Sequence, residues 1–167
     1  MGMEHVPDGT LSEYIDAKQK NQEKVSDIEG AKIMQAICKA VAYFHDNGVI
    51  HRDLKTANIL LKDRSDLSSI KIIDFGLCER QLLNRANTEE QAGTLIYMAP
   101  EVAMHQEYTK SVDIWALGII MHLLLTGDKH PYYKREVDNT ETFKKKLSAL
   151  KIVEPDKSFS WIAKNLF

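Results

Sequence analysis

Apolar residues recur at helical spacing in one long stretch near the start of the chain. Four of them share a single helical face: Ile33, Ile37, Val41 and Phe44. Ser26, with Glu29 three residues later, is a capping-box pattern, and Gly48 offers a C-terminal stop. The pattern predicts a long amphipathic helix between these two limits.

Short isoleucine-rich runs follow and indicate strands. The runs are VIH at 49–51, NILL at 58–61 and IKIID at 70–74, and the polar stretch 62–69 separates the last two. We therefore expect a hairpin of small strands. A charged decapeptide, HRDLKTANIL at 51–60, lies between the long helix and this hairpin.

Three further helices are predicted in the second half. One begins at Ser111 or Asp113, is apolar on nearly all faces and stops near Gly127, so it belongs at the centre of a domain. Residues 140–150 form a lysine-rich amphipathic pattern, and residues 160–167 begin another helix.

Composition narrows the possible partners. The 167 residues carry a net charge of −2, which provides no basic field for nucleic acid or for an anionic membrane. Cys38 and Cys78 lie far apart without metal-ligand spacing, which favours free thiols in a reducing compartment. We expect a cytoplasmic protein that binds neither nucleic acid nor membranes.

Several short motifs occur in a specific order. HRDL begins at residue 51 and is followed after three residues by Asn58; DFG lies at 74–76 and APE at 99–101. GTLIYMAPE precedes the helical run SVDIWALGI, and HPYY follows it. Each motif alone is weak, but the ordered set resembles the C-terminal lobe of a eukaryotic-type protein kinase over essentially the whole chain.

The resemblance implies an α+β fold, a mostly helical C-terminal lobe with small β-hairpins. Residues 1–167 would form a partial protein kinase domain, running from the hinge to the start of a late helix, with the activation segment at 74–101. Neither the glycine-rich loop nor the strand lysine with its helix glutamate is found. We expect the N-terminal lobe to lie outside this sequence.

By the same resemblance, four residues carry the chemistry. Asp53 would accept or orient the proton of the substrate hydroxyl, and Lys55 would reach the transferring phosphate. Asn58 and Asp74 would hold Mg²⁺. Lys55 within DLKxxN resembles kinases that act on serine or threonine, because tyrosine kinases usually carry Ala or Arg there.

The resemblance also places ATP. Glu4 and Val6 would offer backbone hydrogen bonds to adenine, Thr10 would stand near the ribose, and Leu60 would lie beneath the adenine ring. Lys55 would contribute to phosphate binding.

Regulation would centre on a cationic pocket. Arg52 implies a site that a phosphorylated activation segment can neutralise, with Arg80 as a second cation. Thr88 is the candidate phosphate acceptor, although the two glutamates after it could supply charge without modification. Thr94 would lie beside the substrate acceptor residue.

Supporting roles are expected for other residues. His51 and Phe75 would pack to align the loop, and Asp113 would bind its backbone from the central helix. Cys78 is expected to be an ordinary small apolar residue. The remaining histidines are expected at the surface or in packing, not as metal ligands: His5, His45, His105, His122 and His130.

Two classes of function remain. The first is a protein serine/threonine kinase lobe that transfers the γ-phosphate of ATP to protein hydroxyls, the isolated chain being weakly active or inactive. The alternative is a non-catalytic kinase-like module that binds a partner. The intact catalytic set favours the first, and GTLIYMAPEV with SVDIWALGII resembles calcium/calmodulin-dependent kinases.

Overall fold

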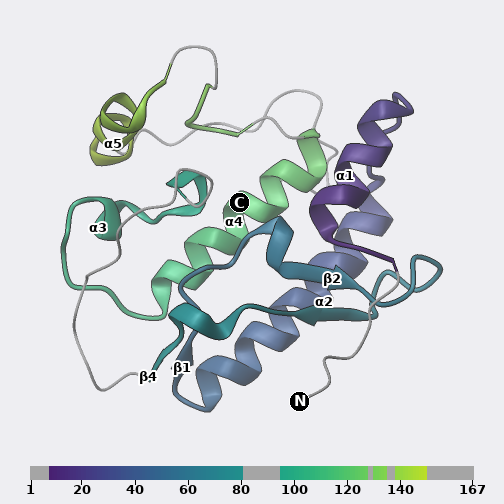
Figure 1. The fold of residues 1–167 in the computed structure, drawn as a ribbon, viewed down its shortest axis with the longest axis horizontal. Helices are drawn as coiled ribbons and strands as arrows, with labels where there is room; N and C mark the ends of the chain where they lie inside the picture. The colour runs from purple at the N-terminus through teal and green to yellow at the C-terminus, as the bar shows by residue number, and fades with distance from the viewer. Residues whose placement is uncertain (1–7, 81–94, 128–129, 135–137, 150–167) are drawn as a thin grey trace.

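The computed structural model describes residues 8–80, 95–127, 130–134 and 138–149. Its helices are α1 (Leu11–Lys20), α2 (Asp27–Asp46), α3 (Pro100–Ala103), α4 (Ser111–Thr126) and α5 (Thr140–Ser148). Its strands are β1 (Val49–Ile50), β2 (Ile59–Leu61), β3 (Ile70–Ile72) and β4 (Glu79–Arg80). Three 3₁₀ turns join them: η1 (Thr56–Asn58), η2 (Phe75–Leu77) and η3 (Leu95–Tyr97). The arrangement is α+β and mostly helical (Figure 1), as predicted.

The long helix predicted from the apolar stripe is α2. Its capping box forms as expected, because the Ser26 hydroxyl accepts the Glu29 amide and the Glu29 carboxylate accepts the Ser26 amide. Gly48 follows the C-terminus with a φ of 71°, in the left-handed region that favours glycine. A second capping box, between Thr10 and Glu13, begins α1 and was not predicted.

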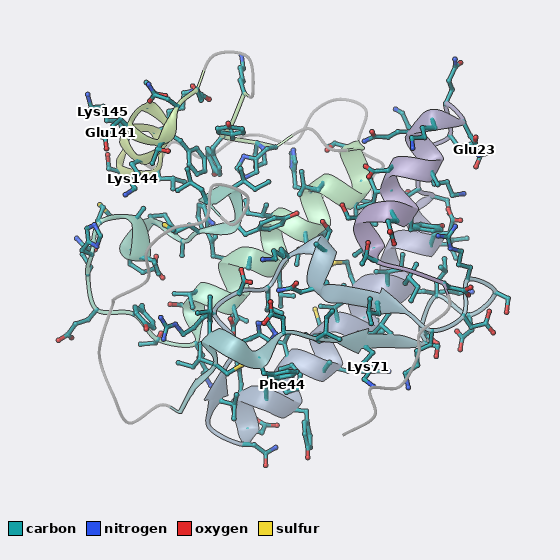
Figure 2. The ribbon with its side chains drawn as sticks, in the orientation of Figure 1. Glu23, Phe44, Lys71, Glu141, Lys144 and Lys145 are labelled. Carbon is teal, nitrogen blue, oxygen red and sulfur yellow. The ribbon has the colours of Figure 1, made fainter. Side chains whose placement is uncertain are left out.

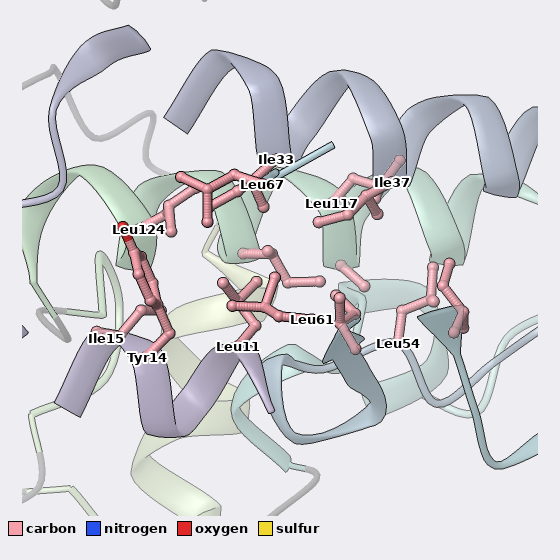
Figure 3. Close-up of a cluster of buried hydrophobic side chains, with 14 of the residues drawn as sticks. Leu11, Tyr14, Ile15, Ile33, Ile37, Leu54, Leu61, Leu67, Leu117 and Leu124 are labelled. Atoms are coloured by element: carbon pink, nitrogen blue, oxygen red, sulfur yellow. The ribbon is translucent and has the colours of Figure 1, made fainter. Parts of the chain in front are cut away.

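The main hydrophobic core lies where α1, the β2–β3 hairpin, α2 and α4 meet (Figure 3). Its fully buried members come from all four elements and include Leu11, Ile33, Ile37, Leu61 and Leu124. Each such side chain stabilises the fold by about 1.5–3 kcal/mol relative to an exposed one. The apolar helix α4 is therefore central, as its sequence predicted.

The predicted hairpin is confirmed, with antiparallel pairing of Ile59 with Ile72 across β2 and β3. The VIH run does not join it. Instead β1 pairs antiparallel with β4, so that Val49 lies opposite Arg80. This pairing places the start of the charged decapeptide beside the segment that follows DFG.

A second hydrophobic cluster includes the buried side chains of α5. Phe143 and Leu147 are buried there with Leu95 and Ala103, and Trp115 of α4 packs against them. Helix α5 confirms the prediction for residues 140–148, while residues 150 and 160–167 lie outside the described residues. Figure 2 shows the exposed Glu141 and Lys145 on the outer side of α5. No helix in the described ranges is long and apolar enough to cross a membrane.

Candidate active site

The catalytic loop is held by a buried carboxylate from the central helix. Asp113 of α4 accepts the backbone amide of His51 at 2.9 Å and that of Arg52 at 2.9 Å, one on each carboxylate oxygen. Its side chain is 1% exposed. The expected anchoring of the loop by Asp113 is confirmed.

Arg52 adopts a backbone conformation that non-glycine residues rarely take. Its φ of 70° lies in the left-handed region, which costs an L-residue about 1–2 kcal/mol. The bond from its own amide to Asp113 offsets this cost. The guanidinium lies 5.3 Å from the ring centroid of Tyr108, a cation–π distance. Its predicted role in binding a phosphorylated segment stays a prediction.

Lys55 and Asn58 both donate hydrogen bonds to the carboxylate of Asp53. The Lys55 ammonium donates to Asp53 Oδ2 at 2.7 Å, and the Asn58 amide donates to the same oxygen at 3.1 Å. Asn58 also donates to the Asp53 carbonyl at 2.8 Å. Asp53 is 5% exposed, and its other oxygen, Oδ1, is buried without a hydrogen-bond partner. A buried acceptor without a partner is costly unless a ligand supplies the missing donor.

His51 fixes the geometry of this loop as a neutral ring. Its Nδ1 accepts the Asp53 amide at 3.3 Å, so Nε2 carries the proton that is donated to the Ile73 carbonyl at 3.1 Å. Burial lowers the pKa of His51 and favours this neutral form. The centroid of the ring also lies 5.0 Å from that of Phe75, a contact that agrees with the packing roles expected of the two residues.

Asp74 lies at the edge of the same site. A backbone bond from Ile73 to the Asn58 carbonyl, 2.9 Å long, brings the residue before Asp74 next to the loop. Asp74 has a φ of 64°, and its exposed side chain accepts the Gly76 amide at 3.4 Å.

The donor set at this edge fits Mg²⁺. The Asn58 nitrogen makes the bonds to Asp53, which leaves its side-chain oxygen outside them, and the carboxylate of Asp74 is exposed. Such hard oxygen ligands suit Mg²⁺, which usually takes one or two carboxylates and completes its shell with water and substrate phosphate. Among the described residues, no group of three or more His, Cys, Asp or Glu could hold a metal ion by itself.

The structure brings together two of the residues predicted to bind nucleotide. Thr10 and Leu60 form an antiparallel β-bridge, and the Leu61 amide donates to the Gly9 carbonyl at 3.0 Å. The Thr10 hydroxyl accepts the Glu13 amide as the cap of α1. Their contacts with nucleotide stay predictions.

Other predicted site residues cannot be placed beside the loop. Glu4, Val6, Thr88 and Thr94 lie outside the described residues. Arg80 contributes its backbone to β4, and its side chain also lies outside the description. Their roles stay predictions.

The sequence interpretation missed one residue that supports the loop. His45 was expected only to pack or to lie at the surface, but its Nε2 lies 2.8 Å from Asp113 Oδ2. A signal was present, because His45 continues the four-residue spacing of Ile37 and Val41 on the buried face of α2. A polar side chain on such a face needs a buried partner.

Cys78 behaves as predicted. Burial raises the pKa of its thiol to about 11, so the reactive thiolate is scarce at neutral pH. The sulfur lies 3.7 Å from the His51 carbonyl, consistent with a packing role beside the loop.

Comparison with known proteins agrees with this site. Residues 1–166 match the family model described as protein kinase domain. Protein kinase C-like 2 of Schizosaccharomyces pombe is 38% identical over 141 residues, which are 84% of this chain and 13% of that protein. The serine/threonine-protein kinase CLA4 of Saccharomyces cerevisiae is 34% identical over 137 residues, 80% of this chain and 16% of that protein.

A calcium/calmodulin-dependent protein kinase type 1 of Caenorhabditis briggsae is 37% identical over 131 residues, 78% of this chain and 35% of that protein. The chain thus spans about a third or less of the length of these relatives. The family match covers nearly every residue of the chain, and two residues of the HRDLxxxN motif, Lys55 and Asn58, bond to its buried aspartate. The chain belongs to the protein kinase domain family.

Proposed function

We propose that this chain carries the catalytic lobe of a protein serine/threonine kinase, which transfers the γ-phosphate of ATP to protein hydroxyls. The observation that supports it most is the convergence of Lys55 and Asn58 on one oxygen of Asp53, while the other oxygen is buried without a partner. A purely binding module has no chemical need for this arrangement.

The proposed reaction follows from these contacts. The substrate hydroxyl donates to Asp53 Oδ1, which orients its oxygen toward the γ-phosphorus and receives its proton as the new O–P bond forms. The bond between the γ-phosphorus and the oxygen that bridges the β- and γ-phosphates breaks, and ADP leaves. Lys55 carries a positive charge 2.7 Å from Asp53, where it can compensate charge on the transferring group.

Asn58 and Asp74 are the proposed metal-holding residues. When bound, Mg²⁺ neutralises charge on the phosphates. The backbone bond from Ile73 to Asn58 sets the spacing between the loop and the DFG segment.

Thr10 and Leu60 are the described part of the proposed nucleotide side. Their β-bridge would place the ribose and adenine against α1 and β2. Protein substrates and ATP are the proposed partners. The two free cysteines support a reducing compartment such as the cytoplasm.

Phosphate transfer from labelled ATP to a generic basic protein tests this proposal. The purified chain and the longest translation product that contains it would be compared, each with Asp53→Asn. We expect the longer product to phosphorylate serine or threonine, Asp53→Asn to reduce the rate by about two orders of magnitude or more, and the isolated chain to transfer little. Asp16→Asn, an exposed change on α1, is the matched control.

The alternative predicts a different result. If the longer product transfers no phosphate with Mg²⁺ and ATP, or if Asp53→Asn transfers as well as the parent, the kinase proposal is wrong. Binding of a partner without turnover would then favour the non-catalytic module.

A further inference from the structure

A pair of residues ties the turn of the β2–β3 hairpin to the segment that enters α1. Nε and Nη2 of Arg64 donate to the carbonyl oxygen of Asp8 at 3.1 and 3.0 Å. In return, the Arg64 backbone amide donates to Asp8 Oδ2 at 2.6 Å. Three hydrogen bonds therefore join two residues that lie 56 positions apart, and Figure 1 shows the segment that enters α1 beside the hairpin turn.

The hairpin turn that carries Arg64 is itself held in place. The Lys62 amide donates to the Ser69 carbonyl at 2.9 Å and closes the turn at its base. Leu67, within the turn, is buried in the main hydrophobic core. Because the turn is fixed by its own hydrogen bond and by the core, Arg64 gives Asp8 a firm point of attachment.

This attachment lies next to the contacts that bring the segment before α1 against β2. The Leu61 amide donates to the Gly9 carbonyl at 3.0 Å, and Thr10 forms its bridge with Leu60. Gly9 has a φ of 79°, a left-handed conformation that glycine adopts without steric cost. Such a short pairing specifies its register weakly, and a slip of one residue would turn each side chain to the other face. The hydrogen bonds of Arg64 add the constraint that fixes the register.

The Arg64 contacts lie at the end of β2 that is remote from the proposed phosphate residues. Asn58 directly precedes β2, whereas Arg64 is in the turn that follows it. The three residues of β2 lie between them, which is about 10 Å of strand. Loss of the Arg64 bonds would therefore displace Thr10 and Leu60 more than it would disturb the contacts between Asn58 and Asp53.

We propose that Arg64 is a positioning residue for the adenosine part of ATP: by holding Asp8 it sets the register of Thr10 against Leu60. The inference rests on the proposed kinase function, in which Thr10 and Leu60 lie beside the ribose and the adenine. It deepens that function by assigning a determinant of nucleotide affinity that lies outside the HRD, DFG and APE motifs. It assigns no direct contact between Arg64 and ATP.

Four variants in the longest product that contains this chain test the proposal. Arg64→Met removes the guanidinium donors and keeps a long side chain, whereas Asp8→Ala removes the carboxylate that accepts the Arg64 amide. Asp8→Asn keeps an acceptor oxygen. Lys24→Met, an exposed position between α1 and α2, is the matched control for the loss of one positive charge.

The measurements separate the adenosine part of the nucleotide from its phosphates. Calorimetry would give the Kd for adenosine, which has no phosphate and requires no turnover. Steady-state kinetics would give kcat and the KM values for ATP and for the protein substrate. Thermal unfolding would report the folding of each variant.

Arg64→Met should raise the Kd for adenosine and the KM for ATP together, each by about threefold to tenfold, as expected for the loss of hydrogen bonds at an exposed site. Both kcat and the KM for the protein substrate should change by less than about twofold. Asp8→Ala should change the same two constants in the same direction. Asp8→Asn and Lys24→Met should remain close to the parent.

Other outcomes would overturn the inference. If Arg64→Met binds adenosine as tightly as Lys24→Met does, Arg64 has no positioning role. A rise in the KM for ATP without a rise in the Kd for adenosine would place the effect at the phosphates and contradict the proposal. Should Arg64→Met unfold, the comparison of Asp8→Ala with Asp8→Asn decides the same question.

The test distinguishes this inference from the proposed function. A parent protein that transfers phosphate in a manner that depends on Asp53, with an Arg64→Met variant that binds adenosine normally, would contradict the role of Arg64 alone. A parent protein that binds adenosine with a dependence on Arg64 but transfers no phosphate would contradict the kinase function alone.

Discussion

His45 Nε2 donates a hydrogen bond of 2.8 Å to Asp113 Oδ2, and both side chains are almost completely buried. The same oxygen accepts the His51 amide, and the second oxygen accepts the Arg52 amide. The last turn of α2, the catalytic loop and the first turn of α4 therefore meet at one carboxylate.

Replacing Asp113 with Asn should destabilise the protein. The amide has only one acceptor oxygen, so at least one of the three donors around it would lose its partner in a buried site. We expect a loss of about 2–3 kcal/mol in the free energy of unfolding, measured by urea denaturation. Asp16→Asn, exposed on α1, should change it by less than about 0.5 kcal/mol. Equal stability of the two variants would contradict a supporting role for the Asp113 carboxylate.

His45→Leu should also lower the free energy of unfolding, because it removes a support of the catalytic loop. Leucine fits the buried face of α2 but cannot donate to Asp113, and a hydrogen bond to a charged group contributes about 1.5–3 kcal/mol. The matched control is Gln35→Leu, an exposed position on the same helix. Urea denaturation of His45→Leu, Asp113→Asn and the double variant should show non-additive losses. Strict additivity would mean that the two side chains act independently.

Much of the fold was predictable because its signals are local. The capping box of Ser26 and Glu29, the hairpin and the apolar helix α4 each depend on residues within a few positions of one another. The motif resemblance supplied the expected partnership of Asp113 with the loop backbone, which the structure confirms.

Contacts between distant segments were not predictable from the same patterns. The pairing of β1 with β4, the bond between Thr56 and Tyr97, and the bond between His45 and Asp113 depend on the tertiary fold. Spacing along the chain describes which face a residue occupies, but not which group lies opposite. His45 could be assigned to a buried face, yet its partner became visible only in three dimensions.

Acid should destabilise the cluster around α5 through His130. Its Nδ1 accepts the amides of Tyr132 and Tyr133, and Nε2 donates to Ile96, so the site requires a neutral ring. Burial lowers the pKa of His130 from 6.5 to about 4. Between these values the unfolded chain binds more protons than the folded one, so the stabilisation is complete above pH 6.5 and falls until about pH 4.

The measurement is urea denaturation at pH 7 and pH 5. From pH 7 to pH 5 the free energy of unfolding of the wild type should fall by about 2 kcal/mol more than that of His130→Gln, because glutamine does not titrate in this range. His51 is present in both proteins, so its own lowered pKa affects them alike. The same pH dependence in both would show that His130 does not remain neutral in the folded protein.

Two glycines should respond to alanine in opposite directions. An added Cβ meets no atom within 4 Å at Gly48 or at Gly118, so neither change creates a steric clash with a neighbouring residue. Gly48 has a φ of 71°, where alanine costs about 1–2 kcal/mol. Gly118 lies inside α4, where alanine gains about 0.5–1 kcal/mol.

Thermal unfolding distinguishes these effects. Gly48→Ala should lower Tm and Gly118→Ala should raise it, each by about 2–4 °C for a chain of this size. Because both sites are open in space, the difference in sign isolates backbone conformation as the cause. A drop in Tm for Gly118→Ala would mean that another group packs against that face of α4 in solution, since the backbone there already favours alanine.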